Sequence, residues 1–384
     1  MIRDRESLAA FLAQIRRFVR EALVPREAEV AQTDDVPADI LARMRELGLY
    51  GMSLPEAHGG LGLTMEEEAL VAFELGGTSP AFRSAIGTNN GIGSQGLVLD
   101  GTDAQRRRYL PRLANGALIG AFALTEPDSG SDAASLRTRA RRIDGGWVLD
   151  GTKRYITNAP KAGLFTVFAR SDPARKGASG ISAFLVESGT PGLRVGAPDR
   201  KMGQRGALTS DVVLEECHVA DDALLGGVPG QGFRTAMKVL DRGRLHISAV
   251  CVGVAERLIA DALRFAMERR QFGQPIAEFQ LIQAMLADSR AEALAGRAMV
   301  LETARRKDDG ADVATDAACC KLFCAEMVGR VADRAVQIHG GAGYMQDYAV
   351  ERFYRDVRLF RIYEGTSQIQ QLVVARGMIR EARG

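Results

Sequence analysis

Close to the C-terminus the chain reads Ile362-Tyr363-Glu364-Gly365-Thr366-Ser367-Gln368-Ile369-Gln370. The single carboxylate of this stretch, Glu364, is followed directly by a glycine and then by small and polar side chains. A glycine allows the backbone to turn tightly and a ligand to come close. A carboxylate beside such a turn can take a proton from a bound substrate. Because a Glu-Gly pair at a helix boundary is more often only a solvated turn, the rest of the chain has to decide between these interpretations.

The bulk composition is that of a globular protein that works on small molecules. The 384 residues predict two or three domains at about 150 residues each. Hydrophobic residues at 46% and charged residues at 26% are ordinary values. A formal net charge of +2 gives no reason to expect nucleic acid or an anionic membrane as a partner.

The cysteines and histidines signal neither a disulfide framework nor a metal centre. The five cysteines are odd in number and contain no CxxC pair, and the four histidines are scattered. The N-terminus has no apolar segment typical of a secretory signal, and no run of about 18 apolar residues predicts a membrane span. A cytoplasmic location is therefore the default expectation.

Residues 1–117 have the pattern of helices. Leu8, Phe11, Leu12, Ile15, Phe18, Val19 and Ala22 recur at the spacing of one helix face. Pro25 is expected to end this helix, and Gly48 to close a second, shorter one. Thr64 and Glu67 predict a capping box at the start of a third.

Residues 118–228 have a different texture, in which turn signals separate short apolar runs of strand length. Runs of this kind are 147–149, 164–169, 181–186 and 212–214, with Asp144-Gly145-Gly146 as a turn. No helical pattern separates these runs, so an antiparallel barrel or sandwich is favoured over alternating βαβ units. No GxGxxG follows a strand, which argues against a Rossmann nucleotide site.

Residues 229–384 return to the helical period. Apolar faces cover 233–240, 247–267, 282–307 and 314–338, and these lengths suit a bundle of long antiparallel helices. The predicted layout is therefore an all-α domain, a β domain and a second all-α domain.

Five polar or glycine-rich motifs follow one another along this layout. They are residues 123–132, 153–159, 268–276, 337–344 and 362–370. Hydroxyls, free amides, an aromatic ring and arginines in these motifs could hold a flat ring and a phosphate. Each motif also has an ordinary structural explanation as a solvated loop, a strand end, or a helix terminus, and that explanation is favoured for any one of them alone.

With 55–63 and 201–205, these motifs match those of the flavin-dependent acyl-CoA dehydrogenase family in type, order and spacing, and the chain resembles this family over essentially its whole length. The resemblance implies an N-terminal all-α domain, a central antiparallel β-barrel or sandwich domain, and a C-terminal four-helix bundle. It also implies bound FAD and a homotetramer, of which a dimer of dimers is one form, with a neighbouring subunit completing the FAD site.

The resemblance also assigns residues to FAD. The expected cofactor contacts are Phe122, Leu124, Thr125, Ser131, Tyr155 and Thr157 at the flavin ring, Arg269, Phe272, Gln280, Gln337, Gly340 and Gly341 toward the FAD of a partner subunit, and Thr366 and Gln368 on the adenosine side. Many relatives carry Trp where this chain has Tyr155.

Glu364 matches the family's catalytic base. The implied reaction removes the α-proton of an acyl-CoA thioester while a β-hydride passes to the flavin, giving the trans-2-enoyl-CoA. Some relatives place the base near Arg244, but Leu240-Asp241-Arg242-Gly243-Arg244 contains no glutamate. The expected substrate contacts are Ser131, Asp241, Arg244 and Gly365.

Several questions stay open at the level of the sequence. Ala207 stands where many relatives have a serine that contacts CoA, so a carrier-protein thioester is an alternative to acyl-CoA. The same fold could also serve an acyl-CoA oxidase, a nitroalkane oxidase, a flavin monooxygenase or a non-catalytic scaffold. The chain length argues against the acyl-CoA oxidase. Glu364 argues against the nitroalkane oxidase and the flavin monooxygenase, and the intact flavin motifs together with Glu364 argue against the non-catalytic scaffold.

The expected electron acceptor is an electron-transferring flavoprotein. The expected acyl group is short, medium or branched. Gly91, Gly93 and Gly96 suggest either room for this group or close helix packing.

Overall fold

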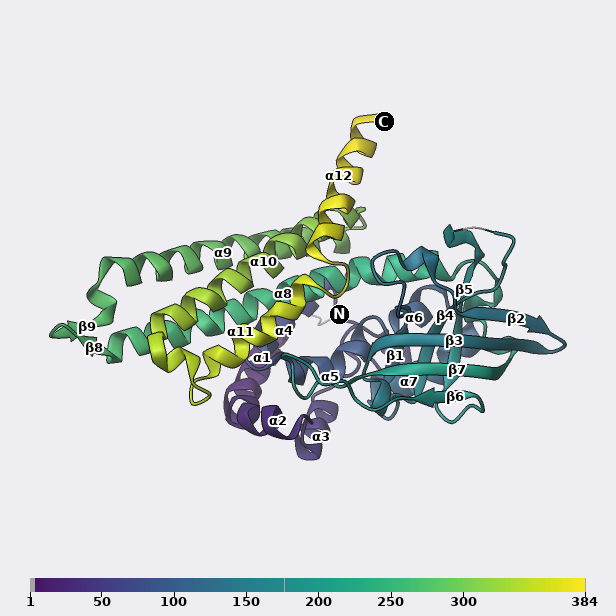
Figure 1. Cartoon of the computed structure of the whole chain (residues 1–384), viewed down its shortest axis with the longest axis horizontal. Helices are drawn as coiled ribbons and strands as arrows, with labels where there is room; N and C mark the ends of the chain where they lie inside the picture. Colours follow the sequence, from purple (N-terminus) through teal and green to yellow (C-terminus); the bar gives the residue numbers. More distant parts are fainter. Residues whose placement is uncertain (1–3, 176, 384) are drawn as a thin grey trace.

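The computed structural model describes residues 4–175 and 177–383, in which helices, then strands, then helices follow one another along the chain (Figure 1). The first region contains α1 (Arg5–Phe18), α2 (Glu27–Thr33), α3 (Ala38–Glu46), α4 (Met65–Gly76), α5 (Pro80–Asn90), α6 (Gln95–Asp100) and α7 (Asp103–Ala114). The predicted all-α start of the chain is confirmed.

Local sequence signals explain where these helices begin and end. The Thr64 hydroxyl accepts from the Glu67 N–H at the start of α4, and the Glu67 carboxylate accepts from the Thr64 N–H, so the predicted capping box is present. Beyond α1 the helix continues through a π-helical turn (Val19–Leu23) into a short 3-10 turn that contains Pro25. The regular α-helix stops at Phe18, but helical turns continue through Pro25 directly into α2, so the expectation that Pro25 ends the helix is wrong.

The second region is one seven-stranded sheet. Its strands are β1 (Gly120–Ala123), β2 (Arg139–Ile143), β3 (Gly146–Thr157), β4 (Leu164–Arg170), β5 (Ile181–Glu187), β6 (Leu193–Val195) and β7 (Thr209–Ala220). The order is β1-β4-β2-β3-β7-β6, and β5 pairs with β4. Most neighbours are antiparallel, as predicted, but β4 runs parallel to β1 and, through one residue pair, to β2. The sheet is therefore mixed at this edge.

The third region is built on α8 (Gly232–Glu268), with α9 (Gln280–Asp308), α10 (Ala314–His339), α11 (Ala349–Val357) and α12 (Ser367–Arg383). A two-stranded hairpin, β8 (Arg270–Gln271) and β9 (Gln274–Pro275), joins α8 to α9. At 37 residues, α8 is about 55 Å long and runs from the sheet to the far tip of the bundle (Figure 1). The apolar pattern indicated two separate segments, but the polar residues between them do not interrupt the helix.

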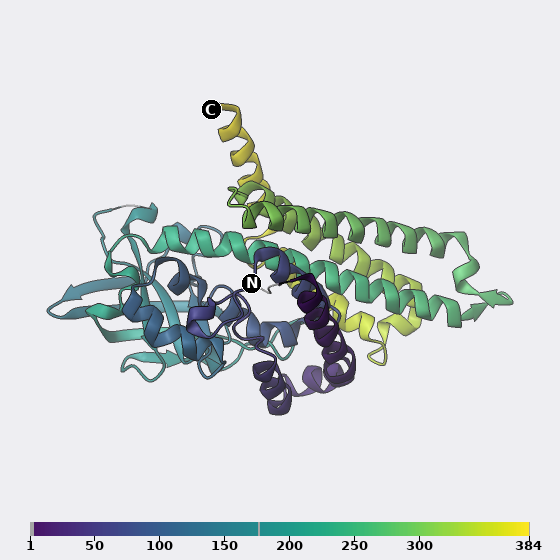
Figure 2. The same ribbon diagram turned by 180° about the vertical axis from the view of Figure 1, so that it is seen from behind.

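The N-terminal helices are fixed to the bundle by a shared core. The largest buried cluster combines α4 side chains with those of α8, α9, α10 and α11. Gly76 of α4 and Gly253 of α8 allow this approach, since a Cβ on Gly76 would lie 2.7 Å from Gly253 Cα. Seen from behind, α1 crosses the bundle, while α12 projects away from it (Figure 2). In the described ranges, no helix combines the length and apolarity needed to span a bilayer.

Candidate active site

A cavity of about 340 Å³ lies where the N-terminal helices, the sheet and α8 meet. The predicted residues that line it are Phe122, Leu124, Thr125, Ser131, Tyr155, Thr157, Arg244, Glu364 and Gly365. They come from the β domain, from α8 and from the turn before α12. The fold therefore brings together residues that are up to about 240 positions apart in the sequence.

The turn that carries Glu364 is held in a left-handed conformation. The φ angle is +54° at Glu364 and +88° at Gly365. A non-glycine residue in this region costs about 1–3 kcal/mol, so the surrounding contacts must impose the conformation. Lys321 Nζ donates to Gly365 O (2.6 Å), and Gln370 Nε2 donates to the carbonyl oxygens of Glu364 and Gly365 (3.1 Å each). These contacts fix the backbone on which the carboxylate sits.

Glu364 is half-buried, and one oxygen of its carboxylate is buried without a partner. Its Oε2 atom accepts no hydrogen bond from the described residues. Burial raises the pKa of Glu364, and the charges of Arg83, Lys321 and Arg244 only partly offset this. A carboxylate in this environment is a stronger base than one in water.

Gly243 of α8 packs directly against this carboxylate. A Cβ at position 243 would lie 2.2 Å from Glu364 Oε2. The space that a side chain at position 243 would need is thus occupied by the Glu364 carboxylate. The backbone N–H of Glu364 makes no hydrogen bond in the described structure, so it remains available to a ligand.

The β-domain wall offers hydroxyls beside apolar and aromatic groups. Tyr155 has φ +59° and lies at an irregularity in the pairing of β3 with β7, two residues before Thr157. The Tyr155 ring is 63% exposed, and Arg154 stacks over it at 4.4 Å. Among the described residues, the hydroxyls of Thr125, Ser131 and Thr157 have no hydrogen-bond partner. This wall suits a flat heteroaromatic ring, as the predicted flavin would require.

A buried ion pair joins the first two motifs of the sequence. Lys153 Nζ on β3 donates to Glu126 Oε1 (2.7 Å), and both side chains are buried. Glu126 also accepts from the backbone N–H groups of Arg137 (2.6 Å) and Thr138 (2.9 Å). Although burial opposes it, the Lys153 charge holds the pKa of Glu126 below its usual range. The loop that carries Thr125 and Ser131 is therefore anchored to the sheet rather than being a solvated turn.

Arg244 and Asp241 lie one helical turn apart on α8. Arg244 Nη1 donates to Asp241 Oδ1 (2.6 Å). Arg244 lines the cavity, whereas Asp241 does not. Within this chain Asp241 therefore orients Arg244, and its predicted contact with substrate stays a prediction.

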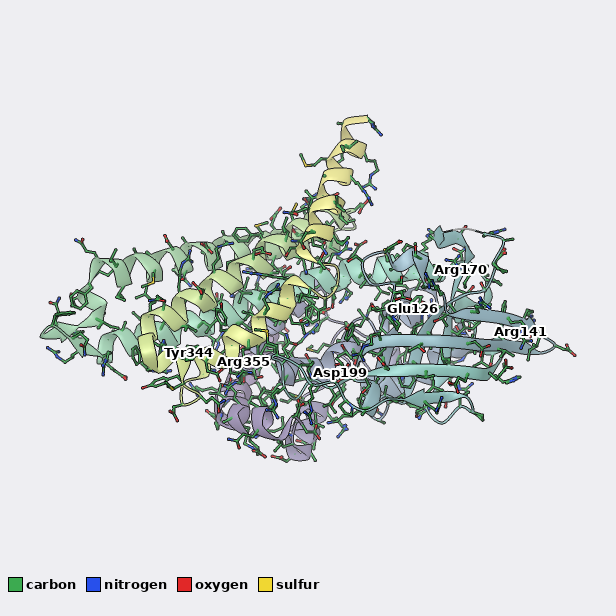
Figure 3. All side chains as sticks on the ribbon, in the orientation of Figure 1. Glu126, Arg141, Arg170, Asp199, Tyr344 and Arg355 are labelled. Atoms are coloured by element: carbon green, nitrogen blue, oxygen red, sulfur yellow. The ribbon has the colours of Figure 1, made fainter. Side chains whose placement is uncertain are left out.

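The remaining predicted FAD contacts lie away from the cavity in this chain. Arg269, Phe272 and Gln280 surround the hairpin at the tip of the bundle, and Gln337, Gly340 and Gly341 close α10. Phe272 is 93% exposed. Tyr344, which follows these glycines, and Glu126 lie on opposite sides of the molecule's centre (Figure 3). These residues do not line the cavity of their own chain, and their role at the FAD of a partner subunit stays a prediction. Thr366 directly precedes α12 and Gln368 lies in its first turn, both outside the cavity wall, and the Thr366 hydroxyl accepts from the Ile369 N–H (3.2 Å).

Five residues near the base belong to none of the sequence motifs. They are Glu68, Arg83, Arg242, His246 and Lys321. Arg242 and His246 are four residues apart, which places both on one face of a helix whose other residues are mostly apolar. That spacing is the sequence signal from which Arg242 and His246 could have been predicted. Glu68 is hidden in the acidic run 66–68, and Lys321 in an alanine-rich stretch.

The glycines near the predicted acyl site play two roles. Gly93 allows close packing, because a Cβ there would lie 2.8 Å from the carbonyl carbon of Gly120. Gly91 instead lines the cavity. Ala207 is buried in the same wall, where it presents a methyl group and no hydroxyl.

Comparison with known proteins finds one family along most of the chain. Models of the N-terminal, middle and C-terminal domains of acyl-CoA dehydrogenase match residues 5–117, 121–217 and 230–379. The probable acyl-CoA dehydrogenase YngJ of Bacillus subtilis (strain 168) is 40% identical over 366 residues, which cover 95% of this chain and 96% of that protein.

Solved structures show the same fold. Butyryl-CoA dehydrogenase from Megasphaera elsdenii superposes with a TM-score of 0.93 at 33% identity, covering 97% of this chain and 98% of that one. The prolyl acyl carrier protein oxidase AnaB superposes with a TM-score of 0.92 at 30% identity, covering 98% and 99%. The predicted three-domain fold is confirmed, and the chain belongs to the acyl-CoA dehydrogenase family of flavin-dependent oxidoreductases.

Proposed function

We propose that the chain oxidises the α,β bond of an acyl-CoA thioester to the trans-2-enoyl-CoA, with Glu364 as the base that removes the α-proton. The observation that carries the proposal is the unpartnered Oε2 of Glu364 in the wall of the cavity. Burial raises the pKa of Glu364 toward the pKa of the carbon acid from which it would take the proton. The free N–H of Glu364 could bind the thioester oxygen and stabilise the charge that develops there.

FAD, when bound, supplies the acceptor for the hydride that leaves the β-carbon. Phe122, Leu124, Thr125, Ser131, Tyr155 and Thr157 would hold its ring system from one subunit. Arg269, Phe272, Gln280, Gln337, Gly340 and Gly341 of a second copy, with Thr366 and Gln368, would hold the remainder. This assignment requires a homotetramer or at least a dimer, and the exposure of Phe272 supports it.

The test is an anaerobic absorbance spectrum of the purified holoenzyme with a panel of acyl-CoAs. We expect the flavin band to bleach with one class of acyl group, and the similarity to butyryl-CoA dehydrogenase supports a short or medium chain. The yellow colour should remain in Glu364→Gln, but the bleaching should disappear. Bleaching that persists in Glu364→Gln would place the base elsewhere. Reoxidation by an electron-transferring flavoprotein, and not by oxygen, would favour a dehydrogenase over an oxidase.

A carrier-protein thioester is the second candidate substrate. Ala207 supports it, because this wall lacks the hydroxyl expected to contact CoA. The similarity to the prolyl acyl carrier protein oxidase AnaB supports it as well. Bleaching by an acylated carrier protein, together with none by the matching acyl-CoA, would select this candidate.

A further inference from the structure

A second cavity lies behind one wall of the active site. Its volume is about 350 Å³, and it lies where α3, α5, the segment before β1 and the loop after β3 meet. This volume is within the range of small-molecule sites. At three places, neighbouring residues of the chain line opposite cavities, the first of each pair the active site and the second this one: Ser84 and Ala85, Thr157 and Asn158, and Thr209 and Leu208. The two cavities therefore share a wall.

Most of the side chains that line the second cavity are apolar. They include Val36, Leu41, Leu118, Ile119 and Leu208, from the N-terminal helical region and the β domain. A ligand with a hydrocarbon body would bury apolar surface against them, which is favourable. The cavity therefore suits a molecule that is largely apolar.

Arg45 of α3 adds a cation that has no acid partner. Its Nε donates to Gly116 O (3.2 Å), and its Cζ lies 5.6 Å from the centroid of the Tyr50 ring. Its two terminal nitrogens make no hydrogen bond or ion pair with a described residue. Lys161, the other charged side chain of the lining, is paired with Asp35. Because no acidic side chain of the described ranges lines the cavity, the charge of Arg45 is left without compensation.

The hydroxyl of Tyr50 also lacks a partner. Tyr50 lines the cavity and is only 1% exposed, yet its hydroxyl makes no hydrogen bond with a described residue. The ring is held against Gly116, where a Cβ would lie 2.8 Å from Tyr50 Cγ. Burial raises the pKa of Tyr50, so the hydroxyl keeps its proton and can donate it in a hydrogen bond. A buried hydroxyl without an acceptor is unfavourable, and a ligand could supply that acceptor.

We propose that this second cavity binds a small apolar molecule that ends in a carboxylate. The planar fork of the Arg45 guanidinium matches a carboxylate, and the Tyr50 hydroxyl would donate to it as well. A phosphate dianion suits the cavity less, because the lining has only one uncompensated positive charge. The inference goes beyond the proposed function, since this ligand is not the thioester that reacts.

Asn158 connects the second cavity to the active site. It lines the second cavity, and its Nδ2 donates to Ser84 O and to Thr88 Oγ1 on α5 (2.9 Å each). Ser84 and Thr88 line the active-site cavity. A ligand that moves or fixes Asn158 therefore acts on that wall of the active site. The ligand is thus an effector that changes the affinity for the thioester, and the thioester must change the affinity for the effector by the same factor.

The binding site is tested with 3-phenylpropanoate and its neutral amide, 3-phenylpropanamide, which have nearly the same shape. Calorimetry on the flavin-loaded enzyme should show that the acid binds about 10-fold more tightly than the amide. Arg45→Gln should abolish this preference, and Tyr50→Phe should reduce it. Arg83→Gln removes an arginine of the active-site cavity instead, so it serves as the matched control and should leave the preference unchanged.

Three results would overturn the binding site. They are equal affinity for acid and amide, no binding of either, and a preference that is lost in Arg83→Gln but kept in Arg45→Gln. The last result would mean that the acid binds in the active-site cavity.

The effector role is tested on the flavin-loaded Glu364→Gln protein, which should not consume the substrate. The dissociation constant of hexanoyl-CoA should change by about 5-fold or more when 3-phenylpropanoate is saturating. Adding Asn158→Gly keeps a residue suited to the φ of +61° but removes the amide, so binding of the acid should remain while this change shrinks. An unchanged dissociation constant would overturn the effector role. If no acyl-CoA binds at all, the proposed function fails, and the comparison of acid with amide still decides whether the second site exists.

Discussion

Glu126 in the β domain and Glu364 in the turn before α12 are both carboxylates, but the protein surrounds them in opposite ways. Glu126 accepts from a lysine and from two backbone N–H groups, and its pKa lies below the usual range. Glu364 has an unpartnered oxygen, and its pKa is raised. A carboxylate whose acceptor sites are filled stabilises the fold, whereas one left without donors is reserved for chemistry.

Glu68 shows that a place in the active-site cavity does not by itself make a carboxylate available for chemistry. It lines the active-site cavity, yet both of its oxygens are used, and Arg242 and His246 lower its pKa to about 2 in spite of its burial. Both oxygens of Glu68 are therefore committed to residues of α8. The three glutamates therefore differ in whether a carboxylate oxygen is left without a hydrogen-bond donor: only Glu364 has one.

Replacement of Glu364 should have the largest effect on activity and little effect on stability. Glu364→Gln removes the base, so kcat should fall by about 10⁴-fold, at the upper end of the range for a general base. Glu364→Asp keeps a carboxylate that is one methylene shorter and should retain more activity. Stopped-flow reduction of the flavin measures both variants, and the melting temperature serves as the control. A large loss of stability in Glu364→Gln would contradict the comparison.

Replacement of Glu126 should have the opposite effect. Glu126→Gln leaves the Lys153 ammonium buried without a counter-charge, which should lower the free energy of unfolding by about 3–5 kcal/mol. The midpoint of urea denaturation of the holoenzyme measures this change. The double variant Glu126→Gln, Lys153→Met removes the uncompensated charge and should recover part of the loss. If Glu126→Gln were as stable as the wild type, the ion pair would not anchor this loop.

Gly243→Ala should reduce activity by moving the base without removing it. The new Cβ would meet Glu364 Oε2 at 2.2 Å, and the end of a flexible side chain can move away. A displacement of about 1 Å can lower a rate by about 10²-fold, so kcat should fall by roughly that factor while the protein stays folded. Single-turnover reduction and circular dichroism test the two parts. Unchanged kcat would mean that Glu364 does not act from this position.

Local patterns of residues along the chain were the easiest features to interpret from the sequence. The apolar spacing of the long helices, the capping box at Thr64 and the strand runs in the β domain all depend on local preferences, and the structure contains each of them. The continuous α8 was not predicted, because Asp241, Arg242 and Arg244 interrupt its apolar pattern. Those residues face the cavity or one another, so tertiary contacts explain what periodicity could not.

The site was predictable only where its residues form a motif within a short stretch. Glu364 and Gly365, or Tyr155 and Thr157, are close in sequence and match a known pattern. Arg83, His246 and Glu68 come from three helices, and each is an ordinary helix residue when considered alone. The parallel pairing of β1 with β4 has the same origin, because it joins segments about 40 residues apart. Contacts of this kind need the fold before they can be seen.

The smallest effect expected is a shift in pH dependence when Lys321 loses its charge. The Lys321 ammonium lowers the pKa of Glu364, and burial lowers the pKa of Lys321 itself to about 8. Without this cation the pKa of Glu364 should rise further. Because only the ionised carboxylate accepts a proton, the acidic limb of the kcat/KM profile should move to higher pH in both Lys321→Gln and Lys321→Met.

The two variants separate charge from hydrogen bonding. Glutamine can still donate to the Gly365 carbonyl, whereas methionine cannot, so only Lys321→Met should also loosen the turn and lower kcat at high pH. The pH profile of single-turnover flavin reduction measures both effects. If the acidic limb of the pH profile does not move in either variant, Lys321 only holds the backbone turn at Gly365. Lys321 on α10 would then set the position of Glu364 but not its pKa.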